Sequence, residues 1–122
     1  MLGDAKIMAF AATANADAAR AFYESILGLR LVVDDGFALV FDANGTTLRI
    51  AKVDAVAPPP YTSLGWTVAD AAATARALTA KGVVMERFGG MEQDDLGLWS
   101  VGPVRIGWFR DPDGNLLSIT GP

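Results

Sequence analysis

The sequence of 122 residues contains neither cysteine nor histidine. Without cysteine the chain forms no disulfide and has no thiolate nucleophile. Without histidine it lacks the most common general base and the most common protein ligand of zinc, iron and nickel. Any metal would therefore need a shell of oxygen ligands, and a catalytic base would have to be Asp, Glu, Lys or Tyr.

Long apolar runs and strong charge are missing as well. No window approaches the roughly 18 consecutive apolar residues of a membrane span, so we expect no membrane segment. The N-terminus lacks a basic and then apolar signal region, which favours a cytoplasmic location. The net charge of −4 argues against nucleic acid and anionic membranes as partners, and is compatible with a cationic ligand. A hydrophobic content of 52% with 20% charged residues excludes disorder and allows a sizeable core.

Two β-hairpins of similar design are predicted, one in each half of the chain. In the second, the strands 104–110 and 115–120 flank the turn 111–114, where Asp111 can accept from the backbone two residues on and Gly114 supplies the left-handed conformation. In the first, the strands 37–43 and 46–53 flank Asn44-Gly45, the residue pair of a type I′ turn. The repetition suggests an internal duplication.

Each half is predicted to have the order β-α-β-β-β. In the first half, a strand over 6–12 precedes a helix capped by Asn15 and ended by Gly28, and a strand over 29–34 leads into the hairpin. In the second half, a strand over 62–68, a helix from N-cap Asp70 to Lys81 and a strand over 83–88 precede a loop at 89–97. The prolines at 58, 59 and 60 fit neither helix nor central strand, so 54–60 is a linker.

These elements predict an α+β fold at 1–122, either one globular domain or two small modules sharing a core. The boundaries are module 1 (4–53), the linker (54–60) and module 2 (61–121). Each half leaves one sheet face uncovered by its own helix. That face must meet a counterpart or line a cavity.

Two segments resemble signatures of the vicinal oxygen chelate superfamily, which includes glyoxalase I, extradiol dioxygenases and bleomycin-resistance proteins. Residues 22–29 resemble the FYxxxLGL signature, and 109–115 resemble the closing FxDPDGN hairpin. The resemblance covers nearly the whole chain. It implies paired βαβββ modules that form a curved mixed sheet around a central cavity, with helices on the outer face, completed in a homodimer.

Metal-dependent members of that superfamily place His, Glu or Gln ligands at four inward positions, one on the first and one on the last strand of each module. Carried over, these positions fall at Met8, Arg49, Ser63 and Ser118. A thioether, a permanent cation and lone hydroxyls are poor ligands for a divalent metal. The resemblance therefore implies the scaffold without its metal centre, and we expect no metal and no other cofactor.

Strand alternation predicts a mixed pocket on the inward faces. Met8 and Phe10 would form an apolar wall, and Ser63 and Ser118 would supply hydroxyls. Arg49 would either anchor an anionic ligand group, pair with an acidic residue such as Asp42 or Glu86, or reach solvent.

The tryptophans supply the other candidates. Trp99 would either stack on a planar ligand or pack in a dimer interface, and either Trp108 or Phe109 would face the cavity while the other is core. The acidic residues 92, 94 and 95 form either a rim that attracts a cationic drug or a solvated loop.

The leading hypothesis is a metal-independent protein that binds a small planar or cationic molecule, as in antibiotic resistance of the bleomycin-resistance type, at a dimer crevice between Trp99, Trp108 and Phe10. One alternative is a metal-independent lyase or isomerase with Arg49 as the electrophile toward an oxyanion. Another is a non-catalytic subunit or regulatory module with a vestigial cavity. No acid and base pair is nominated.

Overall fold

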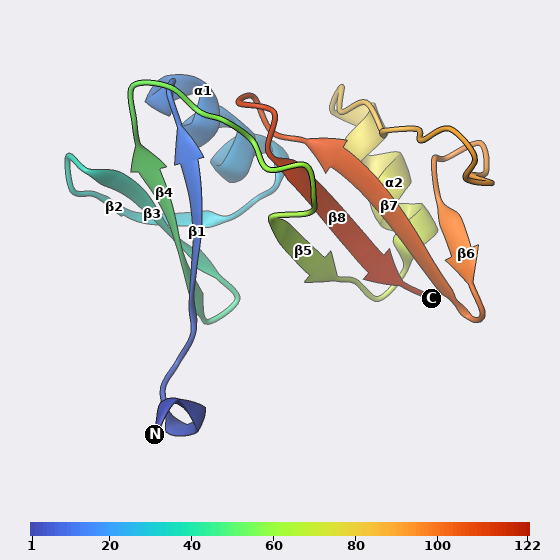
Figure 1. Cartoon of the computed structure of the whole chain (residues 1–122), viewed down its shortest axis with the longest axis horizontal. Helices are drawn as coiled ribbons and strands as arrows, with labels where there is room; N and C mark the ends of the chain where they lie inside the picture. The colour runs from blue at the N-terminus through green and yellow to red at the C-terminus, as the bar shows by residue number, and fades with distance from the viewer. The chain divides into compact units, whose positions relative to one another are not determined.

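The computed structural model describes residues 1–122 and divides them into two compact units, Met1–Ala57 and Pro58–Pro122. Each unit holds one four-stranded sheet (Figure 1). The division falls inside the segment 54–60. No helix of the chain is long and apolar enough to span a membrane.

The first unit begins with a short 3₁₀ turn, Leu2–Asp4, and contains the strands β1 (Met8–Thr13), β2 (Arg30–Asp34), β3 (Ala38–Ala43) and β4 (Thr46–Lys52). Their order in the sheet is β1-β4-β3-β2, with β1 parallel to β4 and the other pairs antiparallel. Helix α1 (Ala16–Arg20) continues as a π-helical segment, Ala21–Ile26.

Local signals set the ends of these elements. The Asn15 side chain accepts from the Ala18 N–H and caps α1, and Gly28 has a φ of 77° where the chain leaves the helical segment. Asn44 and Gly45 have φ values of 50° and 93°, the positive values that a type I′ turn requires at both central positions.

One face of the first sheet carries the core of the unit. Phe41, Leu48 and Ile50 are buried there, and the ring of Tyr23 from the π-helical segment lies 5.8 Å from that of Phe41. The opposite face carries the alternate residues of each strand, because successive side chains in a strand point to opposite sides. The candidate residues of this unit lie on that opposite face.

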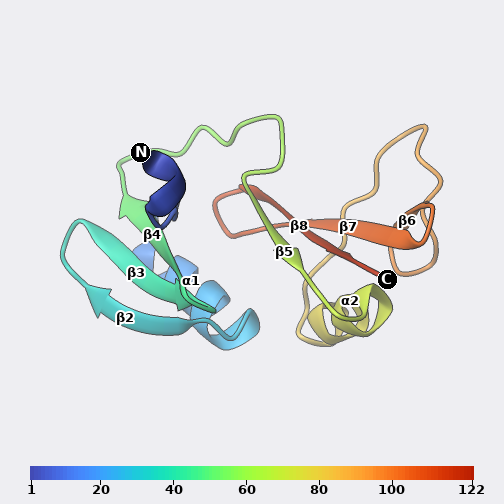
Figure 2. The same ribbon diagram turned by 90° about the horizontal axis from the view of Figure 1, so that it is seen from below.

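The second unit repeats the arrangement. Its strands are β5 (Leu64–Thr67), β6 (Trp99–Val101), β7 (Val104–Arg110) and β8 (Leu116–Gly121), in the order β5-β8-β7-β6 with β5 parallel to β8. Helix α2 (Ala71–Ala80), capped by the Asp70 carboxylate, packs on one side of β7 and β8 (Figure 2). Buried on that side are Phe109, Leu117 and Ile119.

The two sheets match in register as well as in order. In the first, Phe10 lies opposite Arg49; in the second, Gly65 lies opposite Ser118. The predicted α+β class and the βαβββ order of both modules are confirmed.

The predicted strand at 83–88 is wrong. The segment 83–88 makes one backbone hydrogen bond to β7, from the Glu86 N–H to the Trp108 carbonyl oxygen. It forms no further strand pairing, because the rest of the outer edge of β7 pairs with Trp99–Val101. The side chain of Gln93 satisfies the neighbouring backbone, accepting from the Phe88 N–H and donating to the Glu86 and Gly97 carbonyl oxygens. The strand between α2 and the closing hairpin is therefore β6, which lies after the predicted loop.

Candidate functional site

In the first unit, Met8, Phe10 and Arg49 share the sheet face opposite the buried core. Phe10 lies directly opposite Arg49 in the parallel pairing of β1 and β4, and Met8 lies opposite Thr47. The side chains of Met8 and Phe10 are 46% and 60% exposed, so the first unit itself leaves this apolar surface open. The face is therefore an exposed apolar surface with one cation beside it.

The cation is paired. A terminal nitrogen of Arg49 donates to Asp35 at 3.0 Å, in the turn between β2 and β3. The acidic residues considered from the sequence have other partners: Asp42 lies 3.4 Å from Arg30, and Glu86 lies 3.2 Å from Arg110. Pairing with an acid is therefore the alternative that the structure shows, but with a different residue.

Two carboxylates, those of Asp34 and Asp35, organise the turn that holds Arg49. The Lys52 ammonium donates to both carboxylate oxygens of Asp34, at 2.8 and 2.9 Å, and this hydrogen bond together with the Gly36 N–H lowers the pKa of Asp34. The N–H groups of Phe37 and Ala38 donate to Asp35 and lower the pKa of Asp35, with a smaller contribution from Arg49. Asp35 therefore stays ionised beside Arg49 well into the acid range.

In the second unit, Ser118 and Trp108 lie directly opposite each other on β8 and β7, on the face away from α2. Trp99 of β6 lies opposite Ile106, which is two residues from Trp108 and therefore on the same face. Ser63 precedes β5, and its N–H donates to the Leu116 carbonyl oxygen. Phe109 is buried, so of the two neighbouring aromatic residues it is Trp108 that faces away from the core.

The aromatic rings on this face form one group. The Trp99 and Trp108 ring centroids lie 6.3 Å apart with a 33° angle between the planes. The Phe88 ring meets Trp108 edge-on at 5.5 Å. Sequence reasoning did not select Phe88, because its position beside Trp108 depends on the segment 83–88 lying along the edge of β7.

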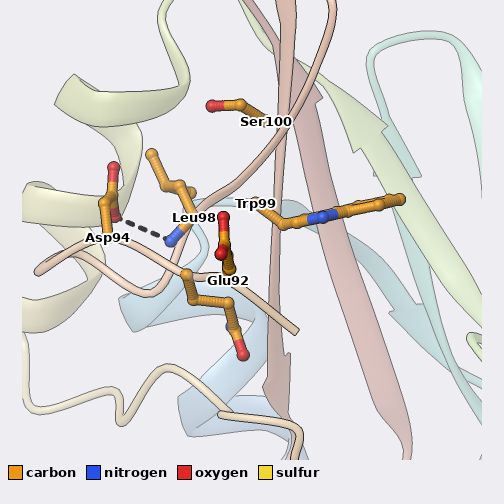
Figure 3. Close-up of a pocket in the computed structure, with 6 residues that line it drawn as sticks. Glu92, Asp94, Leu98, Trp99 and Ser100 are labelled. Carbon is orange, nitrogen blue, oxygen red and sulfur yellow. Dashed lines mark hydrogen bonds between the residues drawn. The ribbon is translucent and has the colours of Figure 1, made fainter. Parts of the chain in front are cut away.

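A pocket of about 330 Å³ opens beside Trp99. It is lined by Glu92, Gln93, Asp94, Leu98, Trp99 and Ser100 (Figure 3). Figure 3 shows the Trp99 indole directed away from Asp94, whose carboxylate is tied to the loop by the N–H groups of Leu96 and Leu98. The lining includes two carboxylates and no basic side chain, which favours a cation as the occupant.

The superfamily positions do not fit a divalent metal. Arg49 brings a positive charge to one of them, Met8 a thioether, and Ser63 and Ser118 bring neutral hydroxyls. The carboxylates near Arg49 and Met8 already have partners: Asp35 pairs with Arg49, and Asp42 accepts from the Gly45 N–H and pairs with Arg30. These four side chains therefore do not make a donor set for a divalent metal.

The chain belongs to the Glyoxalase/Bleomycin resistance protein/Dioxygenase superfamily, whose family description matches residues 7–119. This confirms the relationship inferred from the two sequence signatures. A search of curated proteins returned no significant match.

Solved structures share the fold at low sequence identity. The lactoylglutathione lyase from Agrobacterium tumefaciens is 19% identical, with a TM-score of 0.73 over 96% of this chain and 93% of that chain. The genomically encoded fosfomycin resistance protein from Listeria monocytogenes is 15% identical, with a TM-score of 0.72 over 95% and 91%. A glyoxalase/bleomycin resistance protein/dioxygenase from Alicyclobacillus acidocaldarius is 19% identical, with a TM-score of 0.69 over 97% and 91%.

Proposed function

We propose that this protein binds a small, flat and positively charged molecule without a metal ion, and that it acts as a sequestering protein of the antibiotic-resistance type. The observation that carries the proposal is the pair of tryptophans, Trp99 and Trp108, next to a pocket that contains Glu92 and Asp94. Indole faces attract flat rings and cations, and nearby carboxylates strengthen the attraction for a cation.

Binding without turnover agrees with the side chains present. The chain has no histidine and no cysteine, and the superfamily's ligand positions hold Met8, Arg49, Ser63 and Ser118. A sequestering protein needs apolar surface and charge, and support for both comes from Trp99, Trp108 and the two carboxylates of the pocket beside Trp99. We further propose a homodimer, as the superfamily resemblance implies, and a cytoplasmic location.

A second candidate function uses Arg49 as an electrophile in a lyase or isomerase. Its support is the place of Arg49 next to the open Phe10 surface. Against it stands the bond to Asp35, which offsets part of the charge that an oxyanion would need. Replacing Arg49 with Met separates the candidates: a lyase would lose turnover of its substrate, whereas the binding protein would keep its affinity for a flat cation.

Tryptophan fluorescence tests the leading proposal. The protein is titrated with flat cations such as 1-methylquinolinium, proflavine and ethidium, and calorimetry measures the same binding independently. We expect saturable quenching at micromolar concentrations. Trp108→Ala should weaken the binding by about 5- to 140-fold, since stacking on an aromatic ring contributes about 1–3 kcal/mol.

Trp66 provides the matched control. It lies opposite Ile119 on the side of the sheet that faces α2, so Trp66→Phe should leave the affinity and most of the quenching unchanged. An absence of binding to every cation would refute the proposal. Equal losses in Trp66→Phe and Trp108→Ala would show that the effect does not come from the proposed face.

A further inference from the structure

A hydroxyl without a partner lies beside the tryptophans of the second unit. Ser118 is 8% exposed, and its hydroxyl makes no hydrogen bond to another residue. The hydroxyl oxygen itself is not fully shut off from solvent, so it remains accessible to a ligand. Ser118 is thus a polar group whose hydrogen-bonding capacity the folded chain does not use.

The neighbour of Ser118 on one side is a glycine. Gly65 lies directly opposite Ser118 on β5, and a β-carbon placed there would be 2.7 Å from the Ser118 hydroxyl oxygen. The backbone of Gly65 does not have the positive φ that would require glycine. Glycine is therefore not required here by the backbone conformation. Its lack of a side chain instead leaves room next to the Ser118 hydroxyl.

The neighbour on the other side is Trp108, which lies opposite Ser118 on β7. Gly65, Ser118 and Trp108 thus form one row across three adjacent strands: a position without a side chain, a hydroxyl and an aromatic ring. Trp99 extends the aromatic side, 6.3 Å from Trp108 between centroids. We call this row the hydroxyl notch.

We propose that the hydroxyl notch selects flat rings that carry a hydrogen-bonding group, such as an amide or carbonyl, at their edge. The ring stacks on Trp108, and its edge group occupies the space above Gly65 and bonds to the Ser118 hydroxyl. Ser118 is a binding residue in this arrangement, and Gly65 is a specificity-determining residue that keeps the hydroxyl accessible. The proposal rests on the proposed function, since it names the class of ligand that the same face takes.

The test compares two ligands that differ only at the edge of the ring, 1-methylquinolinium and its 3-carboxamide, by calorimetry. Wild-type protein should bind the carboxamide about three- to tenfold more tightly, as one net hydrogen bond provides. Ser118→Ala should abolish this preference and leave the affinity for 1-methylquinolinium unchanged.

Gly65→Ala tests the role of the glycine. Its methyl group forces the hydroxyl out of the notch, so the carboxamide preference should be lost as in Ser118→Ala. The double variant should be no worse than Ser118→Ala alone, because both substitutions remove the same bond. Gly89→Ala, at a glycine with no atom within 4 Å of the added carbon, and Thr67→Val, on the same face, are controls that should keep the preference.

The outcomes separate this inference from the proposed function. If wild type binds both ligands equally and Ser118→Ala changes neither affinity, the hydroxyl notch is overturned while ring binding stands. If Gly65→Ala weakens the binding of both ligands alike, the added methyl group acts only by its bulk, and the inference is also overturned. If wild type binds no flat cation, the proposed function and the inference fail together.

Discussion

The turn that joins β7 to β8 gives the sharpest prediction of stability, because one carboxylate organises it. Asp111 is 6% exposed and Asn115 is 4% exposed. One oxygen of Asp111 accepts from the N–H groups of Asp113 and Asn115, at 3.0 and 2.9 Å, and the other accepts from the Asn115 side-chain amide at 2.8 Å. The turn positions Trp108 and Ser118, which lie opposite each other on the two strands it connects.

Asp111→Ala would remove the acceptor of two buried donors, the Asn115 backbone N–H and the Asn115 side-chain amide, whereas the half-buried Asp113 N–H can bond to water. At about 1–3 kcal/mol for each buried donor that loses its acceptor, the expected loss is about 2–6 kcal/mol. Asp111→Asn keeps an oxygen for the backbone donors and loses the bond to the Asn115 side chain, so its cost should be about 1–2 kcal/mol.

Thermal and urea unfolding followed by circular dichroism would measure these values. For a chain of this length, the Asp111→Ala loss corresponds to a fall in Tm on the order of 10 °C. Pro112→Ala is the control within the same turn: Pro112 is exposed, and its loss should cost only about 0.5 kcal/mol. An Asp111→Ala protein that melts within about 2 °C of wild type would refute the assignment of the carboxylate as the organiser of the turn.

Three further predictions concern the first unit and the core. Because the pKa values of Asp34 and Asp35 are lowered in the folded state, the stability that these carboxylates add is present above their unfolded pKa of about 4 and is lost as the pH falls through their folded pKa values. The urea midpoint of the wild type should therefore fall below about pH 4. It should fall less in the double variant that carries both Asp34→Asn and Asp35→Asn. Gly45→Ala should lower the free energy of unfolding by about 1 kcal/mol because Gly45 has a φ of 93°, whereas Gly3→Ala, at an exposed glycine with open space around it, should not. Leu117→Ala should cost about 2–5 kcal/mol, since Leu117 is fully buried under α2; an unchanged midpoint would contradict the placement of the core.

Sequence reasoning succeeded where the signal is local. The caps at Asn15 and Asp70, the Asn44-Gly45 turn and the Asp111–Gly114 turn are each determined by a side chain or a φ within a few residues. The segment 83–88 has the composition of a strand, but which segment pairs with β7 depends on competition with Trp99–Val101.

The partners of the candidate residues were equally non-local. Asp35 lies 14 positions before Arg49 and meets it only because β3 and β4 form a hairpin that returns Arg49 to the turn before β3. Alternation nevertheless placed Met8 with Phe10 on one face, since a period of two assigns faces once the strand is right. The open hydroxyl of Ser118 could be recognised only after the register showed glycine and tryptophan on either side.

The most direct test of metal-free ring binding is a fluorescence titration of the wild-type protein with 1-methylquinolinium, carried out in the presence and in the absence of a strong metal chelator. We predict saturable quenching with the same micromolar midpoint in both. Quenching that disappears with the chelator, or that is absent in both titrations, would contradict the proposal.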